Sequence, residues 1–191
     1  MDCMLETLNS GLPGLGLALS DGQKETLCAF GRAVIQQNQV MNLTAITQPD
    51  QVAKLHLLDS LGKRVHWLEE ILPQLGIRAT CLTARAEEAV ADRREQYDIA
   101  TSRAVARLNI LLELTAPYVK VGGRVIAMKG AAAREELAEC TNAIRKLGLK
   151  LEQVKEFPTD GTSHALIVLR KVAPTPGQYP RRYAKIKQSP L

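Results

Sequence analysis

The chain has 191 residues, of which 46% are apolar and 24% are charged, as is typical of one globular domain. No stretch reaches the ~20 apolar residues of a membrane span, and the amino-terminal residues lack the basic-then-apolar order of a signal peptide. We therefore expect a cytoplasmic protein with no membrane partner. The four cysteines and three histidines form no metal-ligand spacing, so we expect no metal site.

The positive charge is concentrated at the carboxyl end. The formal net charge is +5, yet residues 170–191 carry six basic side chains and no acidic one, while the first 169 residues carry 19 basic and 20 acidic ones. Such a tail favours phosphate backbones, because each neutralised phosphate releases condensed counterions. The same pattern also suits a solvated tail that only keeps the protein soluble.

The amino-terminal half is expected to be helical. Ser20 and Gln23 have the spacing of a capping box, which predicts a helix over about 21–39. The glycine-rich stretch 11–16 follows no strand, so it is interpreted as a turn before a helix rather than a phosphate loop. Apolar residues at three- and four-residue intervals predict a second helix from about Asp50 to Leu72.

The second half alternates between strands and helices. Strands are predicted at 79–83, 97–102 and 124–128, helices at 85–93, 104–119 and 131–147, a turn at Gly122-Gly123, and a final antiparallel pair at 149–157 and 165–172. This alternation indicates a mostly parallel sheet with helices on its faces.

Several short motifs occur in order along the chain, and the ordered set is more specific than any one motif. They are Asn42-Leu43-Thr44-Ala45-Ile46-Thr47, His56-x-Leu58-Asp59-Ser60-Leu61, Lys63-Arg64-Val65, Arg85-Ala86-Glu87-Glu88, Thr101-Ser102-Arg103-Ala104-Val105-Ala106, Gly122-Gly123-x-x-x-x-Met128-Lys129-Gly130 and Tyr179-Pro180-Arg181-Arg182. From about Ser20 onward this order resembles the 16S ribosomal RNA guanine-N7 methyltransferase family, also called the glucose-inhibited division protein B family.

The resemblance implies an α/β fold, a Rossmann-like class I methyltransferase sheet preceded by an N-terminal helical extension. It implies methyl transfer from S-adenosylmethionine to N7 of a guanine in 16S rRNA, with that RNA or the small ribosomal subunit as partner, by a monomer. Guanine N7 carries a lone pair and no proton, so the reaction needs alignment of the reactants rather than a general base. No catalytic residue is therefore assigned.

Three cofactor-binding residues follow from the resemblance. Ala86 and Glu87 are implied to lie beside the adenine end of S-adenosylmethionine, and Arg103 to belong to the same site. Without the resemblance, Glu87 would be interpreted as an acidic residue at a helix start that interacts with the helix dipole, and Arg103 as a surface ion-pair partner. For RNA we predict contacts from four basic residues of the tail, with two tyrosines either stacking on bases or packing on the domain: Arg181, Arg182, Lys185, Lys187, Tyr179 and Tyr183.

One part of the family pattern is missing. The resemblance implies a first strand followed by a glycine-rich loop and a helix, but between Thr47 and Arg78 the sequence has two isolated glycines, Gly62 within the predicted helix and Gly76 after it, and no glycine-rich stretch. The family carries an early His-x-Leu-Asp-Ser-Leu and a later Leu-Asp-Ser-Leu-x-Lys-Arg. This chain has a single Leu-Asp-Ser-Leu segment, at 58–61. His56 precedes it as in the early copy, and Lys63-Arg64 follow it as in the later copy. We infer that the intervening strand–loop–helix unit, roughly 30 residues or more, is absent.

Asp59 lies at this junction and has two interpretations. It is either a strand-end acid that can bind a ribose hydroxyl or a residue within the predicted helix, and the continuous apolar stripe favours the helix. We therefore leave it out of the site.

We expect a helical region over 1–76 with the junction near 57–61, a remaining α/β core over 77–172, and a basic tail over 173–191. Because buried unpaired amides cost ~1–3 kcal/mol each, the loss of a central strand predicts that the chain folds poorly or remodels its sheet, and that it binds S-adenosylmethionine weakly or not at all. The alternative function is that of a non-catalytic RNA-binding remnant of the family. A nicotinamide-dependent oxidoreductase is excluded, since no strand–G-x-G-x-x-G–helix exists.

Overall fold

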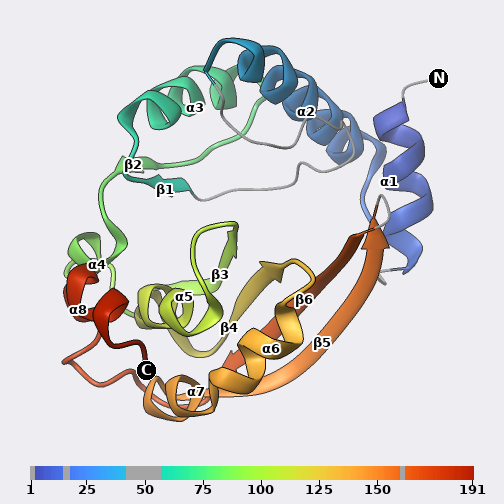
Figure 1. The fold of residues 1–191 in the computed structure, drawn as a ribbon. Coiled ribbons are helices and arrows are strands. Elements are labelled where there is room, and N and C mark those ends of the chain that lie inside the picture. The colour runs from blue at the N-terminus through green and yellow to red at the C-terminus, as the bar shows by residue number, and fades with distance from the viewer. Residues whose placement is uncertain (1–2, 15–17, 42–56, 160–161) are drawn as a thin grey trace. The chain divides into compact units, whose positions relative to one another are not determined.

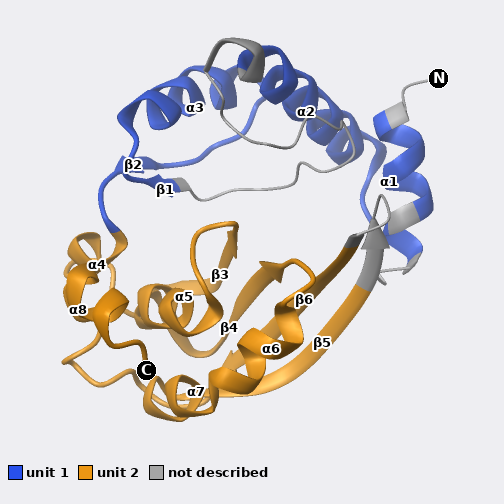
Figure 2. Cartoon of the chain, in the orientation of Figure 1, with its two compact units in different colours: residues 1–85 blue, residues 86–191 orange. Residues whose placement is uncertain are grey.

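The structure is a computed structural model, and it describes residues 3–14, 18–41, 57–159 and 162–191. The chain divides into two compact units, residues 1–85 and residues 86–191 (Figure 1, Figure 2). Each unit has its own sheet and its own hydrophobic cluster, so each is described by itself. None of the described helices is long and apolar enough to cross a membrane.

Unit 1 combines helices with a pair of short strands. Its described elements are α1 (Cys3–Gly14), α2 (Asp21–Met41), β1 (Leu57–Asp59), α3 (Gly62–Gln74) and β2 (Cys81–Thr83). The two strands pair in parallel, with Leu57 opposite Cys81 and Asp59 opposite Thr83. A small cluster packs α3 against α2, and its buried members are Phe30, Val34, Trp67, Leu68 and Leu72.

The predicted capping box at the start of α2 is confirmed. The backbone N–H of Ser20 donates to Gln23 Oε1 over 2.8 Å, and the N–H of Gln23 donates to Ser20 Oγ over 3.3 Å. These two bonds satisfy backbone donors that have no partner inside the helix, so α2 begins at Asp21 as the spacing predicted.

The predicted second helix is wrong over part of its length. Residues 42–56 lie outside the described residues, but Leu57–Asp59 forms β1, and α3 begins only at Gly62. A short apolar run fits a buried strand as well as a helix, and pairing with β2 decides for the strand. Asp59 then ends the strand locally, because its Oδ1 accepts the N–H of Leu61 over 2.9 Å.

Unit 2 holds the larger sheet. Its elements are α4 (Ala86–Ala89), β3 (Tyr97–Arg103), α5 (Leu108–Thr115), the 3-10 helix η2 (Ala116–Tyr118), β4 (Val119–Lys129), α6 (Ala133–Glu139), α7 (Thr141–Lys146), β5 (Leu149–Thr159), β6 (Thr162–Lys171) and α8 (Tyr183–Gln188). The strand order is β3-β4-β6-β5. β3 and β4 are parallel, whereas β6 is antiparallel to both of its neighbours.

The predicted strands of unit 2 are confirmed, and so is the α/β class. The predicted turn at Gly122-Gly123 is wrong, because both glycines lie within β4, at a register shift between Tyr97 and Ile99 of β3. A Cβ on Gly123 would lie 2.4 Å from the Asp98 carbonyl oxygen, so the close approach of the two strands requires glycine there. The predicted helix over 131–147 is divided at Cys140 into α6 and α7.

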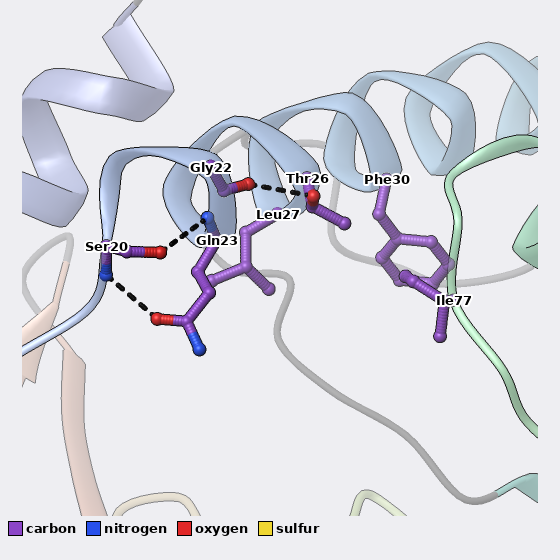
Figure 3. A pocket seen from close by; sticks show the side chains of 7 residues that line it. All are labelled: Ser20, Gly22, Gln23, Thr26, Leu27, Phe30 and Ile77. Atoms are coloured by element: carbon purple, nitrogen blue, oxygen red, sulfur yellow. Dashed lines mark hydrogen bonds between the residues drawn. The ribbon is translucent and has the colours of Figure 1, made fainter.

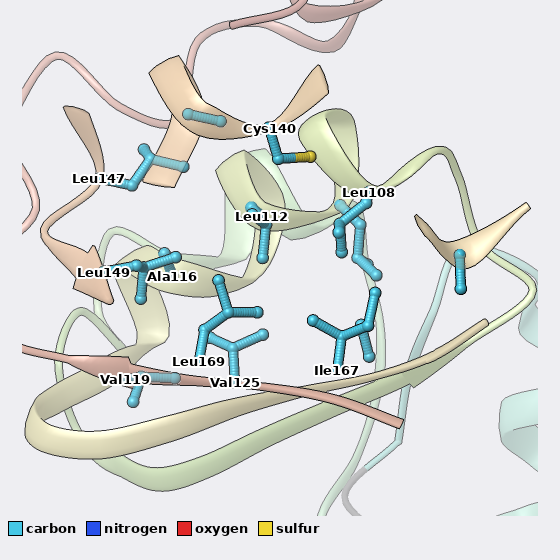
Figure 4. Close-up of a cluster of buried hydrophobic side chains, with 14 of the residues drawn as sticks. Leu108, Leu112, Ala116, Val119, Val125, Cys140, Leu147, Leu149, Ile167 and Leu169 are labelled. Carbon is cyan, nitrogen blue, oxygen red and sulfur yellow. The ribbon is translucent and has the colours of Figure 1, made fainter. Parts of the chain in front are cut away.

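The hydrophobic core of unit 2 lies between the sheet and the helices on one of its faces. Figure 4 shows Leu112 of α5 and Leu147, which follows α7, facing Ile167 and Leu169 of β6. All four are fully buried. The helices α5, α6 and α7 contact β4, β6 and β5 respectively, so this face of the sheet is covered by helices from its own unit.

Two buried charges attach the carboxyl-terminal segment to this core. Lys171 is fully buried, and its ammonium donates to the Ala116 carbonyl over 2.8 Å and to Thr175 Oγ1 over 2.6 Å. Its carboxylate partner is Glu95, at 3.2 Å, which also accepts the Thr175 N–H. Burial lowers the pKa of Lys171. Partial burial by itself raises the pKa of Glu95, but the bonds from Thr175 and Lys171 outweigh it and leave that pKa lowered.

The second buried charge is Glu113 of α5. Its carboxylate is fully buried and accepts the backbone N–H of Arg181 over 2.9 Å. It also accepts two guanidinium bonds from Arg181, over 2.8 and 2.6 Å. Nearby, Tyr179 and Ile186 are buried. The segment after β6 is therefore packed on unit 2 by both charge and apolar burial.

We expect Arg181→Ala to lower the free energy of unfolding by about 3–5 kcal/mol, because it leaves the buried Glu113 carboxylate without its cation. Urea unfolding measures this loss. Arg182→Ala, at the exposed neighbouring residue, is the matched control and should change stability by less than ~0.5 kcal/mol. Equal effects of the two substitutions would contradict a structural role for the pair.

We expect Glu95→Gln to destabilise the protein at neutral pH and much less in acid. A carboxyl group whose pKa is lowered on folding stabilises the fold above its unfolded pKa, and this stabilisation is lost as pH falls through the folded pKa. The difference between wild type and Glu95→Gln should therefore shrink below about pH 4. Thermal unfolding across pH measures it, with the exposed Glu88→Gln as control; a pH-independent difference would show that Glu95 acts by packing alone.

Candidate cofactor site

The predicted adenine-side residues begin the short helix α4. Ala86 and Glu87 are half-buried, and the Ala86 carbonyl accepts the hydroxyl of Tyr118 over 2.6 Å. Burial is the main reason that the pKa of Tyr118 rises to about 12, and the charge of Glu87 adds to it. The tyrosine hydroxyl thus stays protonated and fixes the backbone at the start of α4, where the Ala86 side chain leaves room beside it.

Arg103 is the last residue of β3, at the carboxyl end of the strand, where open α/β sheets bind ligands. Its side chain is exposed, and partial desolvation lowers the pKa of its guanidinium, which remains charged at neutral pH. The next residue, Ala104, has φ of 54°, a left-handed conformation that alanine rarely adopts. The chain therefore turns sharply at the strand end and leads toward α5.

Ser102 precedes Arg103 and was not assigned from the sequence. Its Oγ is buried and, among the described residues, is the buried side-chain oxygen or nitrogen without a hydrogen-bond partner. Leaving such a group unpaired costs ~1–3 kcal/mol. The carboxyl end of β3 thus holds an unsatisfied hydroxyl beside a charged side chain.

The structure places both predicted segments of unit 2 next to the same helix. α4, with Ala86 and Glu87, contacts α5, and β3, with Arg103 at its end, contacts α5 as well. Both segments therefore lie against α5, and the assignment of the three residues to one cofactor site stays a prediction.

Asp59 is the site candidate that the sequence reasoning set aside. The structure puts it at the carboxyl end of β1, opposite Thr83, the last residue of β2. Its two oxygens are held by the Leu61 N–H and by Arg64, at 2.9 and 3.2 Å. The strand-end interpretation was thus the right one. The signals for it were Gly62, at which a new helix starts, and the Lys63-Arg64 context that follows.

A cavity of about 480 Å³ lies elsewhere, in unit 1, beside the first turns of α2. Figure 3 shows Ser20 and Gln23 bonded to each other at its rim, with Leu27, Phe30 and Ile77 supplying apolar walls. None of the predicted cofactor residues lines it, and its described lining carries no charge.

The described residues do not complete a site for S-adenosylmethionine. The short strand-to-helix connections of the described chain run from β1 through Ser60-Leu61 to α3, from β2 through residues 84–85 to α4, from β3 through residues 104–107 to α5, and from β4 through residues 130–132 to α6. Gly130 is the one glycine in these four connections, so none of them is a glycine-rich loop. The described chain therefore offers no glycine-rich backbone cradle for the methionine end of the donor.

A protein-family model, described as rRNA small subunit methyltransferase G, matches residues 52–166. A protein of that name from Alkaliphilus metalliredigens is 34% identical over 96% of this chain and 97% of its own length. Another, from Fervidobacterium nodosum, is 42% identical over 71% of this chain and 65% of its own length. A solved rRNA methylase from Streptococcus thermophilus is 18% identical, with a TM-score of 0.48 over 61% of this chain and 72% of that chain.

The relatives contain positions that this chain lacks. The Alkaliphilus match spans 232 aligned positions, whereas 96% of 191 residues is about 183, so about 49 positions face no residue of this chain. The match to the Clostridium beijerinckii protein, 234 positions against 97% of the chain, also leaves about 49. This surplus exceeds the roughly 30 residues inferred to be missing from the sequence. With the matching family model and these near full-length relatives, the chain belongs to the rRNA small subunit methyltransferase G family.

Proposed function

We propose that this chain serves methyl transfer from S-adenosylmethionine to N7 of a guanine in 16S rRNA, within the small ribosomal subunit or its RNA. The observation that carries the proposal is the match to relatives named ribosomal RNA small subunit methyltransferase G over nearly the whole chain. The proposed enzyme is cytoplasmic and monomeric.

The described residues would contribute positioning rather than acid–base chemistry. Glu87 would accept polar hydrogens at the adenine end of the donor, with Ala86 permitting close approach of the ring. Arg103 would hold a carboxylate or a phosphate with its planar guanidinium. This division suits a reaction in which the acceptor nitrogen has no proton to lose, because its rate then depends on alignment.

A second candidate function is RNA binding without methyl transfer. One observation favours it: the sheet lies in two separate pieces, β1-β2 and β3-β4-β6-β5, and the described chain holds no glycine loop for the donor. Under this proposal the basic carboxyl-terminal segment supplies the affinity for the phosphate backbone.

The basic residues of that segment differ in their availability. Arg181 is engaged by Glu113, so its charge is neutralised within the fold. Arg182, Lys185 and Lys187 are exposed. We therefore propose that these three, on and beside α8, make the phosphate contacts. Of the two tyrosines, Tyr179 is buried and packs in the core, whereas Tyr183, between Arg182 and Lys185, is exposed, so we propose Tyr183 for stacking on a base.

We expect calorimetric titration of the chain with S-adenosylmethionine to give no binding in the micromolar range, because the cradle for the methionine end is absent. The same preparation is then incubated with unmodified 30S subunits and labelled donor. Methyl incorporation at guanine N7 supports the first candidate function. Salt-dependent RNA affinity without incorporation supports the second, and micromolar donor binding would refute our expectation about the missing cradle.

We expect joint replacement of Arg182, Lys185 and Lys187 by glutamine to weaken RNA binding about equally for all sequences. Each lost phosphate contact should also reduce the slope of log affinity against log salt by about 1. Fluorescence anisotropy with labelled 16S rRNA fragments across salt concentrations measures both effects.

The charge-matched control replaces three exposed basic residues of the same unit outside the tail, Arg145, Lys146 and Lys150. An unchanged slope for the tail variant, or the same decrease in both variants, would show that the tail is only a solvated end.

A further inference from the structure

We propose that Lys129 and Glu136 are positioning residues of the candidate cofactor site. Together they hold residues 104–107, the connection that follows Arg103, in a single conformation. The consequence for methyl transfer rests on the proposed function, whereas the order of the connection is a property of unit 2 that is measured without donor or RNA. Neither residue was given a role from the sequence.

The first observation is that Lys129 joins two of the ordered sequence motifs. Lys129 is the last residue of β4, and Arg103 is the last residue of the neighbouring parallel strand β3, so both lie at the carboxyl edge of the sheet. The Lys129 ammonium donates to the Ala106 carbonyl oxygen over 2.7 Å. Ala106 closes the motif that begins at Thr101. The lysine of one motif therefore contacts the backbone of the other, at the edge where open α/β sheets bind ligands.

The second observation is that Glu136 of α6 fixes the far end of the same connection. Its Oε2 lies 2.7 Å from Lys129 Nζ and accepts the backbone N–H of Leu108 over 2.7 Å. Leu108 begins α5, so this N–H has no acceptor within the helix. The two charged side chains are only 10% and 13% exposed, and hydrogen bonds are stronger in such surroundings than in water. One buried ion pair thus binds the backbone at Ala106 and again at Leu108.

The third observation is the conformation of Ala104, at the start of the connection. Its φ of 54° is one that alanine rarely adopts, and such a conformation persists only where the surrounding structure fixes the chain. On one side the register of β3 with β4 fixes Arg103. On the other side the ion pair fixes Ala106 and Leu108. Two residues lie between these fixed points, so the ion pair decides the direction in which the chain leaves Arg103.

Stability alone does not explain this pair. Apolar residues of similar volume are often at least as stabilising as a buried ion pair. Here both charges are used on backbone groups of a strand-to-helix connection rather than on packing between elements. The connection has other ion pairs, from Arg107 to Glu135 and Glu139, but these are exposed, and exposed pairs contribute little. The buried pair is therefore the one that orders the connection.

The test is the backbone order parameter of each residue in the intact chain, measured by ¹⁵N NMR relaxation. Residues 104–107 of the wild type should be as ordered as α5, with values of ~0.85. Lys129→Met removes the donor to the Ala106 carbonyl, so the values for 104–107 should fall below ~0.6 while those of β5 and β6 stay unchanged. Unchanged values at 104–107, or an equal decrease throughout unit 2, would overturn the proposal.

A matched control lies on the same strand. Arg124 of β4 is also paired with a glutamate, Glu152 at 2.7 Å, but it is 43% exposed. Arg124→Met should leave the order of residues 104–107 as in the wild type. Arg107→Met, which breaks only exposed pairs, should lower it much less than Lys129→Met does. If Arg124→Met loosened the connection as much as Lys129→Met, the role assigned to the buried pair would be wrong.

A double variant separates positioning from stability. Lys129→Met combined with Glu136→Leu replaces both charges by apolar groups, so the midpoint of urea unfolding should return toward the wild-type value relative to Lys129→Met alone. The order parameters of residues 104–107 should nevertheless stay low, because the Ala106 carbonyl and the Leu108 N–H both remain without their side-chain partners. Recovery of stability and order together would show that the pair has a structural role alone.

Methyl transfer to unmodified 30S subunits is measured on the same proteins. Lys129→Met should lower kcat roughly tenfold or more with little change in KM, because the rate depends on alignment. A connection that loosens in Lys129→Met, with no methyl transfer by the wild type, would leave the positioning role standing and remove the proposed function. Equal methyl transfer by the wild type and by Lys129→Met would keep the proposed function and overturn the positioning role.

Discussion

Hydrogen bonding between the backbones of neighbouring strands is the interaction on which this protein depends. Each strand of a sheet satisfies its N–H and C=O groups only through the strands beside it, so the absence of one strand affects both of its neighbours. The described strands form two sheets, a parallel pair in unit 1 and four strands in unit 2. Among the described residues β3 pairs with β4 alone, and the buried Ser102 hydroxyl near its carboxyl end has no hydrogen-bond partner.

Unit 2 is stabilised by interactions that do not need that edge. Its sheet is covered on one face by α5, α6 and α7, and its carboxyl-terminal segment is attached by Lys171 with Glu95 and by Glu113 with Arg181. Buried charges are tolerated because each has its counter-charge and further hydrogen bonds. The same attachment uses the charge of Arg181 within the fold and leaves Arg182, Lys185 and Lys187 exposed.

The three residues proposed for the cofactor all belong to unit 2. Ala86, Glu87 and Arg103 lie on elements that contact α5, and the Tyr118 hydroxyl fixes the backbone at Ala86. The unit that we infer to be missing is a strand, a loop and a helix, and its loop would supply backbone amides for the other end of the donor.

The linear pattern was sufficient for the capping box at Ser20, for the strands of unit 2 and for the family, because local hydrogen bonds, period-two alternation and ordered motifs are written in neighbouring residues. It was also sufficient to infer a missing segment from the single copy at 58–61. It failed where contacts between segments that are distant in the sequence determine the local structure. Leu57–Asp59 became a strand because β2 pairs with it, and Gly122-Gly123 lies within β4 because Asp98 of β3 approaches Gly123 closely. Burial of Arg181 against Glu113 joins residues 68 apart, a contact that no local spacing encodes.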